Sequence, residues 1–247
     1  MSEGLNDELT AEAHQLQLRY QGYTLVPNAI PHDMLRVLVE KYDALLPEHG
    51  EVPTGAPPGA SGRDVNRLFE IEPVFADLMD LPSTFPIIER YMNGNVTLLS
   101  SAIANYVPGC APPRVSWHRD GPYVRLTCLL SDVEENGGAM AVLPGTHHGD
   151  ERPDWLTDAD GVPRIIPGEV RIAAPAGTCV INNTLLWHTS TANELDHPRK
   201  LVWIVYKMAE QELTPYIHLR NSQEFVDRQI DPLRMKLCGT AEKEVAP

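Results

Sequence analysis

The chain has 247 residues, of which 43% are hydrophobic and 22% charged, so it has the composition of a soluble globular protein with a sizeable core. Its net charge of -14 argues against a nucleic-acid backbone as partner, because phosphate binding needs clustered Lys and Arg. No apolar stretch approaches the ~20 residues of a membrane span, and the acidic N-terminus does not resemble a secretory signal. We therefore expect a single domain over residues 1–247, in the cytoplasm, with its scattered cysteines reduced.

The first part of the chain, to about residue 95, is predicted to be mainly helical. A first helix leads into a short strand at Tyr23–Val26, and apolar residues at helical spacing predict a second helix over residues 31–47. Residues 49–62 are rich in Gly and Pro and predict a long loop, either a lid over a site or a plain surface excursion. Helical character returns in residues 73–91.

The pattern changes between about residues 96 and 210, where short apolar runs alternate with Gly and Pro turn signals. Such repeated short strands are typical of a β-sandwich or barrel of the jelly-roll type. Because the helices come first and the strands after, we expect a mainly β fold with flanking helices, followed by a C-terminal tail.

The triplet His118-Arg119-Asp120 is the first candidate for chemistry. Residues two apart on a strand point to the same face, so His118 and Asp120 could reach one metal ion. Taken alone, this pattern is also common in ordinary surface pairs of His and Asp.

A second histidine, His188, strengthens the metal interpretation, because it ends a mostly apolar run far along the chain. Two His and one carboxylate bind one face of a metal and leave the other positions open. This arrangement suits non-haem Fe(II) and O2 chemistry. Catalytic zinc sites use a similar donor set, so a zinc hydrolase is an alternative at this point.

A positive charge, Arg199, follows the second histidine at the start of another apolar run. Residues 192–198 are predicted to form a hairpin turn, which would return Arg199 beside His188 on the neighbouring strand. There its guanidinium would suit a cosubstrate that bears a carboxylate. Ser190 shares strand parity with His188 and could hydrogen-bond the same ligand. The alternative for Arg199 is a solvated hairpin charge.

Other notable side chains are assigned to structure or to a possible substrate pocket. We predict core packing for Trp117, Trp187, Cys128 and Cys179, and loop positions for His147, His148 and His197. Arg63, Tyr106 and Arg125 could line a pocket, although each is as compatible with an ordinary surface position.

The chain resembles the phytanoyl-CoA dioxygenase family of Fe(II)- and 2-oxoglutarate-dependent oxygenases. The resemblance rests on the 118–120 triplet, on the stretch NGGAMAVLPGTH at residues 136–147, and on the spacing of His188 and Arg199; Gln21-Gly22-Tyr23 before a strand is also similar. It covers nearly the whole chain and implies a double-stranded β-helix core, cupin-like in type.

The resemblance also implies site residues and a reaction. His118, Asp120 and His188 would bind Fe(II), while Arg199, assisted by Ser190, would hold the distal carboxylate of 2-oxoglutarate. Thr127 falls where the family places another cosubstrate contact. The reaction would consume O2 and 2-oxoglutarate, release succinate and CO2, and hydroxylate or otherwise oxidise a C–H bond of a small molecule. A non-catalytic binding module on the same fold is the second alternative, since fold alone does not determine function.

Overall fold

The computed structural model describes residues 3–50, 63–106, 116–149, 154–159, 163–211 and 221–239. Residues 51–62 of the loop predicted at 49–62, whether a lid or a surface excursion, and the side chains of Arg63 and Tyr106 lie outside the described part, whereas His49 is the last residue of a helix.

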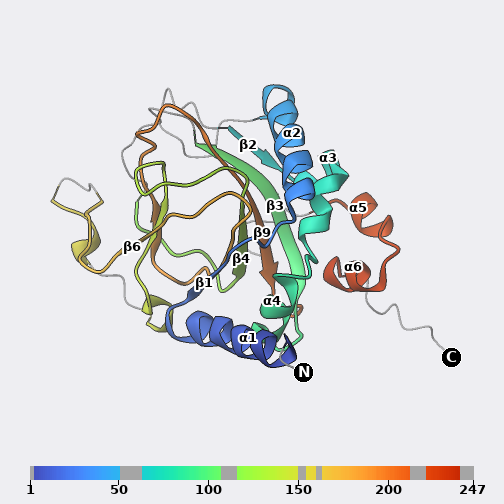
Figure 1. Ribbon diagram of the computed structural model, residues 1–247, viewed down its shortest axis with the longest axis horizontal. Helices are drawn as coiled ribbons and strands as arrows, with labels where there is room; N and C mark the ends of the chain where they lie inside the picture. Colours follow the sequence, from blue (N-terminus) through green and yellow to red (C-terminus); the bar gives the residue numbers. More distant parts are fainter. Residues whose placement is uncertain are drawn as a thin grey trace.

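Two antiparallel sheets form the centre of the molecule (Figure 1). The large sheet has six strands in the order β1 (Tyr23–Val26), β7 (Cys179–Asn183), β4 (Val124–Leu129), β9 (Arg199–Lys207), β3 (Thr97–Tyr106) and β2 (Arg63–Asn66). The small sheet has three strands in the order β6 (Val170–Ile172), β5 (Met140–Val142) and β8 (His188–Ser190). Strands that are distant in sequence therefore lie side by side.

The two faces of the large sheet differ in what covers them. The face that carries Leu126, Val202 and Ile204 packs against the helices in one large apolar cluster. The opposite face, which we call the inner face, looks toward the small sheet, because Val180 of β7 packs with Val142 of β5 in a separate cluster. Side chains alternate along each strand, so every second residue of β4, β7 and β9 points to the inner face.

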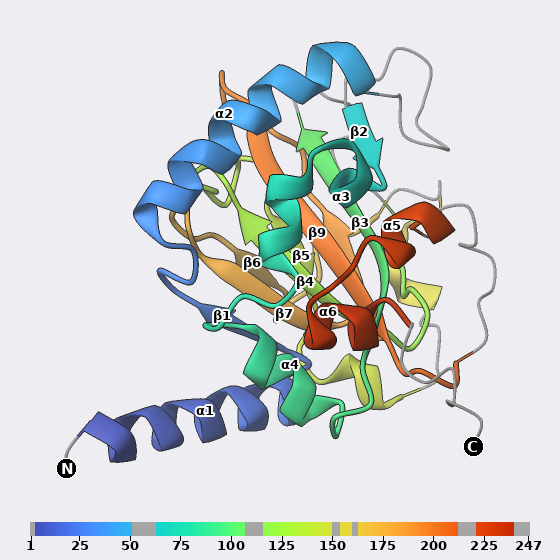
Figure 2. The ribbon, with the colours of Figure 1, turned by 90° about the vertical axis from the view of Figure 1, so that its right-hand side faces the viewer.

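The helices lie on the outer side of the large sheet and across one end of the core (Figures 1 and 2). They are α1 (Glu3–Tyr20), α2 (His32–His49), α3 (Leu68–Ile71), α4 (Phe85–Tyr91), α5 (Gln223–Asp227) and α6 (Pro232–Leu237), with short 3-10 turns η1 (Pro73–Leu78), η2 (Thr146–His148) and η3 (Asp154–Leu156). In the described part of the chain, no helix is long and apolar enough to cross a membrane. The mainly β core with flanking helices confirms the predicted fold class.

Two predicted helices differ from those observed. Helix α2 continues past Pro47 to His49. Its buried stripe of Leu38, Tyr42 and Leu45 belongs to the main apolar cluster, and only two residues lie beyond the proline. The predicted helix over residues 73–91 is interrupted: η1 ends at Leu78 and α4 begins at Phe85.

The predicted hairpin at residues 192–198 is wrong. Strand β8 pairs with β5 in the small sheet, whereas β9 pairs with β3 and β4 in the large sheet. The segment between them therefore crosses from one sheet to the other. Both faces of β9 are covered, and such a central strand gains more from two strand partners than from a local hairpin.

Candidate active site

The two predicted ligand histidines are backbone partners. The amide of His118 donates to the carbonyl of His188 at 3.0 Å, and the amide of His188 donates back to the carbonyl of His118 at 3.0 Å. This isolated bridge, rather than the predicted regular strand, orients the segment around His118. The two imidazole rings consequently lie with their centroids 4.2 Å apart.

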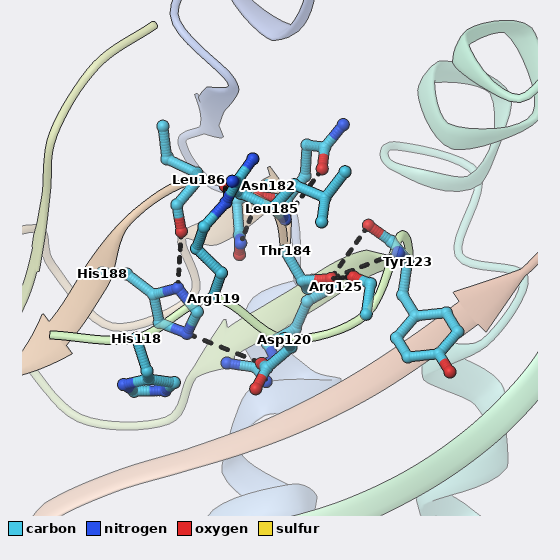
Figure 3. A network of polar contacts seen from close by, with 12 residues as sticks. His118, Arg119, Asp120, Tyr123, Arg125, Asn182, Thr184, Leu185, Leu186 and His188 are labelled. Atoms are coloured by element: carbon cyan, nitrogen blue, oxygen red, sulfur yellow. Dashed lines mark hydrogen bonds and ion pairs between the residues drawn. The ribbon is translucent and has the colours of Figure 1, made fainter. Parts of the chain in front are cut away.

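Each imidazole is oriented by a hydrogen bond to a nearby carbonyl, and Figure 3 shows the one between His188 and Leu186. Nδ1 of His118 lies 2.8 Å from the carbonyl oxygen of Ser116, and Nδ1 of His188 lies 2.8 Å from that of Leu186. A proton on Nδ1 satisfies these carbonyls and leaves Nε2 with a free lone pair, which is the form that binds a metal.

Asp120 completes the group. Its amide donates to the carbonyl of Thr184 at 2.9 Å, which fixes the residue next to the loop before β8. Oδ2 of Asp120 lies 3.6 Å from Nε2 of His188, too far for a hydrogen bond. One ligand atom from each of His118, Asp120 and His188 lies within 4.8 Å of the other two.

This donor set fits a metal ion. Nε2 of His188 is buried and has no hydrogen-bond partner among the described residues. Two imidazole nitrogens and one carboxylate on one side of a site are the donors that non-haem iron uses.

The electrostatics of the group favour the protonation states that a metal needs. Burial lowers the pKa of His118, and the neighbouring His188 lowers it further, so the neutral ring is favoured. Burial disfavours the ionised form of Asp120, but the Arg125 guanidinium favours it, and the pKa of Asp120 lies well below its usual range. Neutral imidazoles and an ionised carboxylate are the forms that coordinate metal.

The predicted cosubstrate residues lie around the space between the two sheets. Arg199 is buried at the start of β9, and its Nη1 donates to the carbonyl of Gly138, two residues before Met140. Met140 is the strand partner of Ser190, so Arg199 reaches the end of the small sheet that carries Ser190. Thr127 is buried on the inner face of β4, opposite Trp203 of β9.

The remaining sequence assignments have mixed outcomes. Trp117, Trp187, Cys128 and Cys179 are buried, as predicted, and the cysteines are free. His147 and His148 lie in η2, but both approach the carbonyl of Arg19 at the end of α1, at 3.1 and 2.7 Å.

The contacts of two charged residues, Arg125 and Asp64, were not predicted from the sequence. Arg125 pairs with Asp120, and Asp64 lies on the same side of the sheet as Arg199. Strand parity with Thr127 was the sequence signal that could have directed Arg125 to the inner face.

A sequence model of the phytanoyl-CoA dioxygenase (PhyH) family matches residues 18–201. The chain belongs to this family. That membership makes the protein a non-haem Fe(II)- and 2-oxoglutarate-dependent oxygenase by class, as the resemblance implied.

Two curated relatives illustrate the family. The chain is 26% identical over 148 residues to a protein named probable alpha-ketoglutarate-dependent hypophosphite dioxygenase from Stutzerimonas stutzeri, and this match covers 50% of the chain and 49% of that relative. It is 22% identical over 261 residues to L-proline trans-4-hydroxylase from Streptomyces griseoviridis, covering 88% of the chain and 96% of the relative. The chain thus spans about half of the first relative and nearly all of the second.

A solved structure supports the fold. The epimerase SnoN, described in complex with Fe3+, alpha ketoglutarate and nogalamycin RO, superposes with a TM-score of 0.71 at 21% identity, over 92% of this chain and 94% of SnoN. At this identity the likeness establishes the cupin-like fold alone.

Proposed function

We propose that this family member oxidises an unactivated C–H bond of a small-molecule substrate, with 2-oxoglutarate and O2 as cosubstrates and succinate and CO2 as products. The observation that carries the proposal is the convergence of His118, Asp120 and His188, with their ligand atoms within 4.8 Å, in the β core of a PhyH-family chain.

In this proposal His118, Asp120 and His188 hold Fe(II), and the bound metal with its cosubstrates supplies the oxidant that attacks the substrate. The chain's own groups prepare that chemistry. The Ser116 and Leu186 carbonyls keep the two Nε2 atoms available, and the ionised Asp120 offsets part of the metal charge.

Arg199, Ser190 and Thr127 are proposed to bind 2-oxoglutarate. Arg199 is the strongest candidate, because a buried guanidinium at the edge of the inner face suits the distal carboxylate. Ser190 would assist it with its hydroxyl, and Thr127 would contact the cosubstrate from β4. Burial of Arg199 and Thr127 also keeps water from that end of the site.

A small organic molecule, such as a secondary metabolite, is the proposed substrate class. Two similar proteins support this choice, since one is named for L-proline and the other is described with nogalamycin RO. We further propose that residues 1–247 act as one domain in the cytoplasm. The free cysteines of the described part suit that compartment, and one apolar cluster joins helices from both ends of the chain to the large sheet.

The zinc hydrolase and the binding module gain no support. A hydrolase needs no buried Arg199 on the inner face of the same β core, and a binding module needs no complete set of two histidines and a carboxylate.

An anaerobic titration of the apo-protein with Fe(II) and 2-oxoglutarate tests the proposal. We expect the weak visible charge-transfer band of the iron chelate to appear and saturate in the wild type and to be lost in His188→Ala. His197→Ala, which changes an exposed histidine, should retain the band. Tight Zn(II) binding without any Fe(II) chelate band would contradict the oxygenase proposal.

A further inference from the structure

Arg125 stands directly beside the proposed metal ligands. It lies on the inner face of β4, between Asn182 of β7 and Val205 of β9, and its Nη2 donates to Oδ2 of Asp120. The side chains of Arg125 and Asp120 are only 23% and 17% exposed, so this ion pair is largely shielded from water. Charge-assisted bonds of this kind are strong and directional.

A second contact limits the motion of the guanidinium. Its central carbon lies 5.8 Å from the centroid of the Trp203 ring, within the range of a cation–π interaction. Trp203 belongs to the adjacent strand β9, so the two strands together orient the planar group. The Arg125 side chain therefore approaches Asp120 in a defined direction.

The position of this bond determines how Asp120 can present itself to a metal. A carboxylate may bind a metal through one oxygen or through both. If Asp120 used both, it would take a coordination position that 2-oxoglutarate or O2 requires. Arg125 donates to Oδ2, the same oxygen that lies 3.6 Å from Nε2 of His188, so it competes there with a metal bond and leaves Oδ1 as the oxygen free to bind.

We propose that Arg125 is a positioning residue that holds the Asp120 carboxylate to a single metal bond and so keeps the open positions free for 2-oxoglutarate and O2. The role rests on the proposed function, because it acts through a metal ligand. It also gives a role to a cation that lies beside the proposed metal ligands, where its charge alone would oppose metal binding.

The chain contains a matched control. Arg119 lies between His118 and Asp120 in sequence, and its guanidinium carbon is also 5.8 Å from a tryptophan centroid, that of Trp187. Its Nε, however, donates to the backbone carbonyl of Leu185, and its side chain points away from the Asp120 carboxylate (Figure 3). A loss of arginine packing can thus be separated from a loss of carboxylate positioning.

The test is an anaerobic titration of the full chain with Fe(II) and then with 2-oxoglutarate, performed on the wild type, Arg125→Gln, Arg125→Lys and Arg119→Gln. Contacts that orient metal ligands typically change affinity about 10–100-fold. We expect Arg125→Gln to weaken 2-oxoglutarate binding at least ~10-fold and to shift the chelate band. Arg125→Lys should recover part of the affinity, and Arg119→Gln should retain the wild-type band and affinity.

The outcomes separate the two proposals. If the wild type shows no chelate band, both the proposed function and the positioning role of Arg125 are wrong. If the wild type shows the band, and Arg125→Gln shows it unshifted and with unchanged 2-oxoglutarate affinity, only the positioning role is wrong. If Arg125→Gln does not fold, Arg125→Lys decides: lysine lacks the planar fork over Trp203, so unchanged affinity in that variant overturns the role.

Discussion

Asp64 is a half-buried carboxylate on the same side of the large sheet as Arg199. Its strand partner is Ala104, which in turn pairs with Leu201, two residues along β9 from Arg199. Burial raises the pKa of Asp64 to about 6, and the Arg199 charge offsets part of that effect. Folding therefore favours the neutral carboxyl, although Arg199 stabilises the ionised form.

This raised pKa predicts a pH dependence of stability. The folded state holds the Asp64 proton up to about pH 6, whereas the unfolded chain releases it near pH 4, so stability is lost as the pH rises through this window. Asp64→Asn should not show that loss. The difference in free energy of unfolding, variant minus wild type, should therefore be up to about 3 kcal/mol larger at pH 8 than at pH 4. Urea unfolding of variant and wild type at pH 4 and pH 8 measures this difference. If the difference between Asp64→Asn and the wild type is the same at both pH values, as expected for the exposed control Glu135→Gln, the prediction is wrong.

Arg199 carries a prediction for the cosubstrate. Arg199→Ala should raise the KM for 2-oxoglutarate at least ~10-fold, because the distal carboxylate would lose a charge-assisted partner in a buried site. Succinate formation at varied 2-oxoglutarate concentrations measures this value, and Arg199→Lys should recover part of the loss. An unchanged KM would exclude Arg199 from the cosubstrate site.

At the scale of elements, α1 is joined to η2 by a close contact. The amide of Gly145 donates to the carbonyl of Gln21 at 2.9 Å, next to the histidine contacts with Arg19. Gly22 leaves the helix with a φ of +85°, and a Cβ at this position would lie 2.6 Å from Nδ1 of His147. Only glycine satisfies both the backbone conformation and the close approach.

Gly22→Ala should therefore destabilise the fold by about 2 kcal/mol or more, since it adds strain at positive φ to a steric clash. Gly94→Ala provides the comparison, because Gly94 also has a positive φ, of +74°, but nothing lies within 4 Å of its added Cβ. Its expected cost is about 1 kcal/mol. Urea unfolding of both variants measures the difference, and equal costs would show that the contact with His147 contributes nothing.

Local patterns predicted elements better than connections. The short run Tyr23–Val26 and the helical spacing before Pro47 both led to observed elements, since each depends on neighbours in sequence. The crossing of the chain from β8 in the small sheet to β9 in the large sheet could not be predicted from local sequence. A turn-like composition at residues 192–198 fits a hairpin and a crossover equally well, and only the strand partners of β9 decide between them.

At the scale of the whole molecule, side-chain parity explains how much of the site could be anticipated. His118 and Asp120 lie two residues apart, and His188 and Ser190 likewise, so sequence alone predicts which pairs share a face. The approach of His118 to His188 depends on pairing between segments about 70 residues apart, so residue types suggested the group but no local spacing specified the contact. The ion pair of Arg125 with Asp120 depends on side-chain conformations that no spacing specifies.

Ligand binding should stabilise the molecule as a whole. Because the proposed ligands come from two distant segments, a metal bound only by the folded state adds stability according to its affinity, about 2.7 kcal/mol at a concentration 100 times its Kd. We expect Ni(II) with 2-oxoglutarate to raise the Tm of the wild type. His118→Ala should lose most of this rise, and the exposed-site variant His197→Ala should keep it. An equal rise in His118→Ala would place the metal elsewhere.

The reciprocal backbone bridge between His118 and His188 joins the two segments that carry the proposed metal ligands. Each residue's amide is protected by the other's carbonyl, so neither amide can exchange with solvent unless the two segments separate. In hydrogen–deuterium exchange of the metal-free protein, both amides should therefore exchange slowly and with the same opening free energy. Slow and matched exchange would show that the two segments are joined without metal, so that metal loading needs no refolding of this pair.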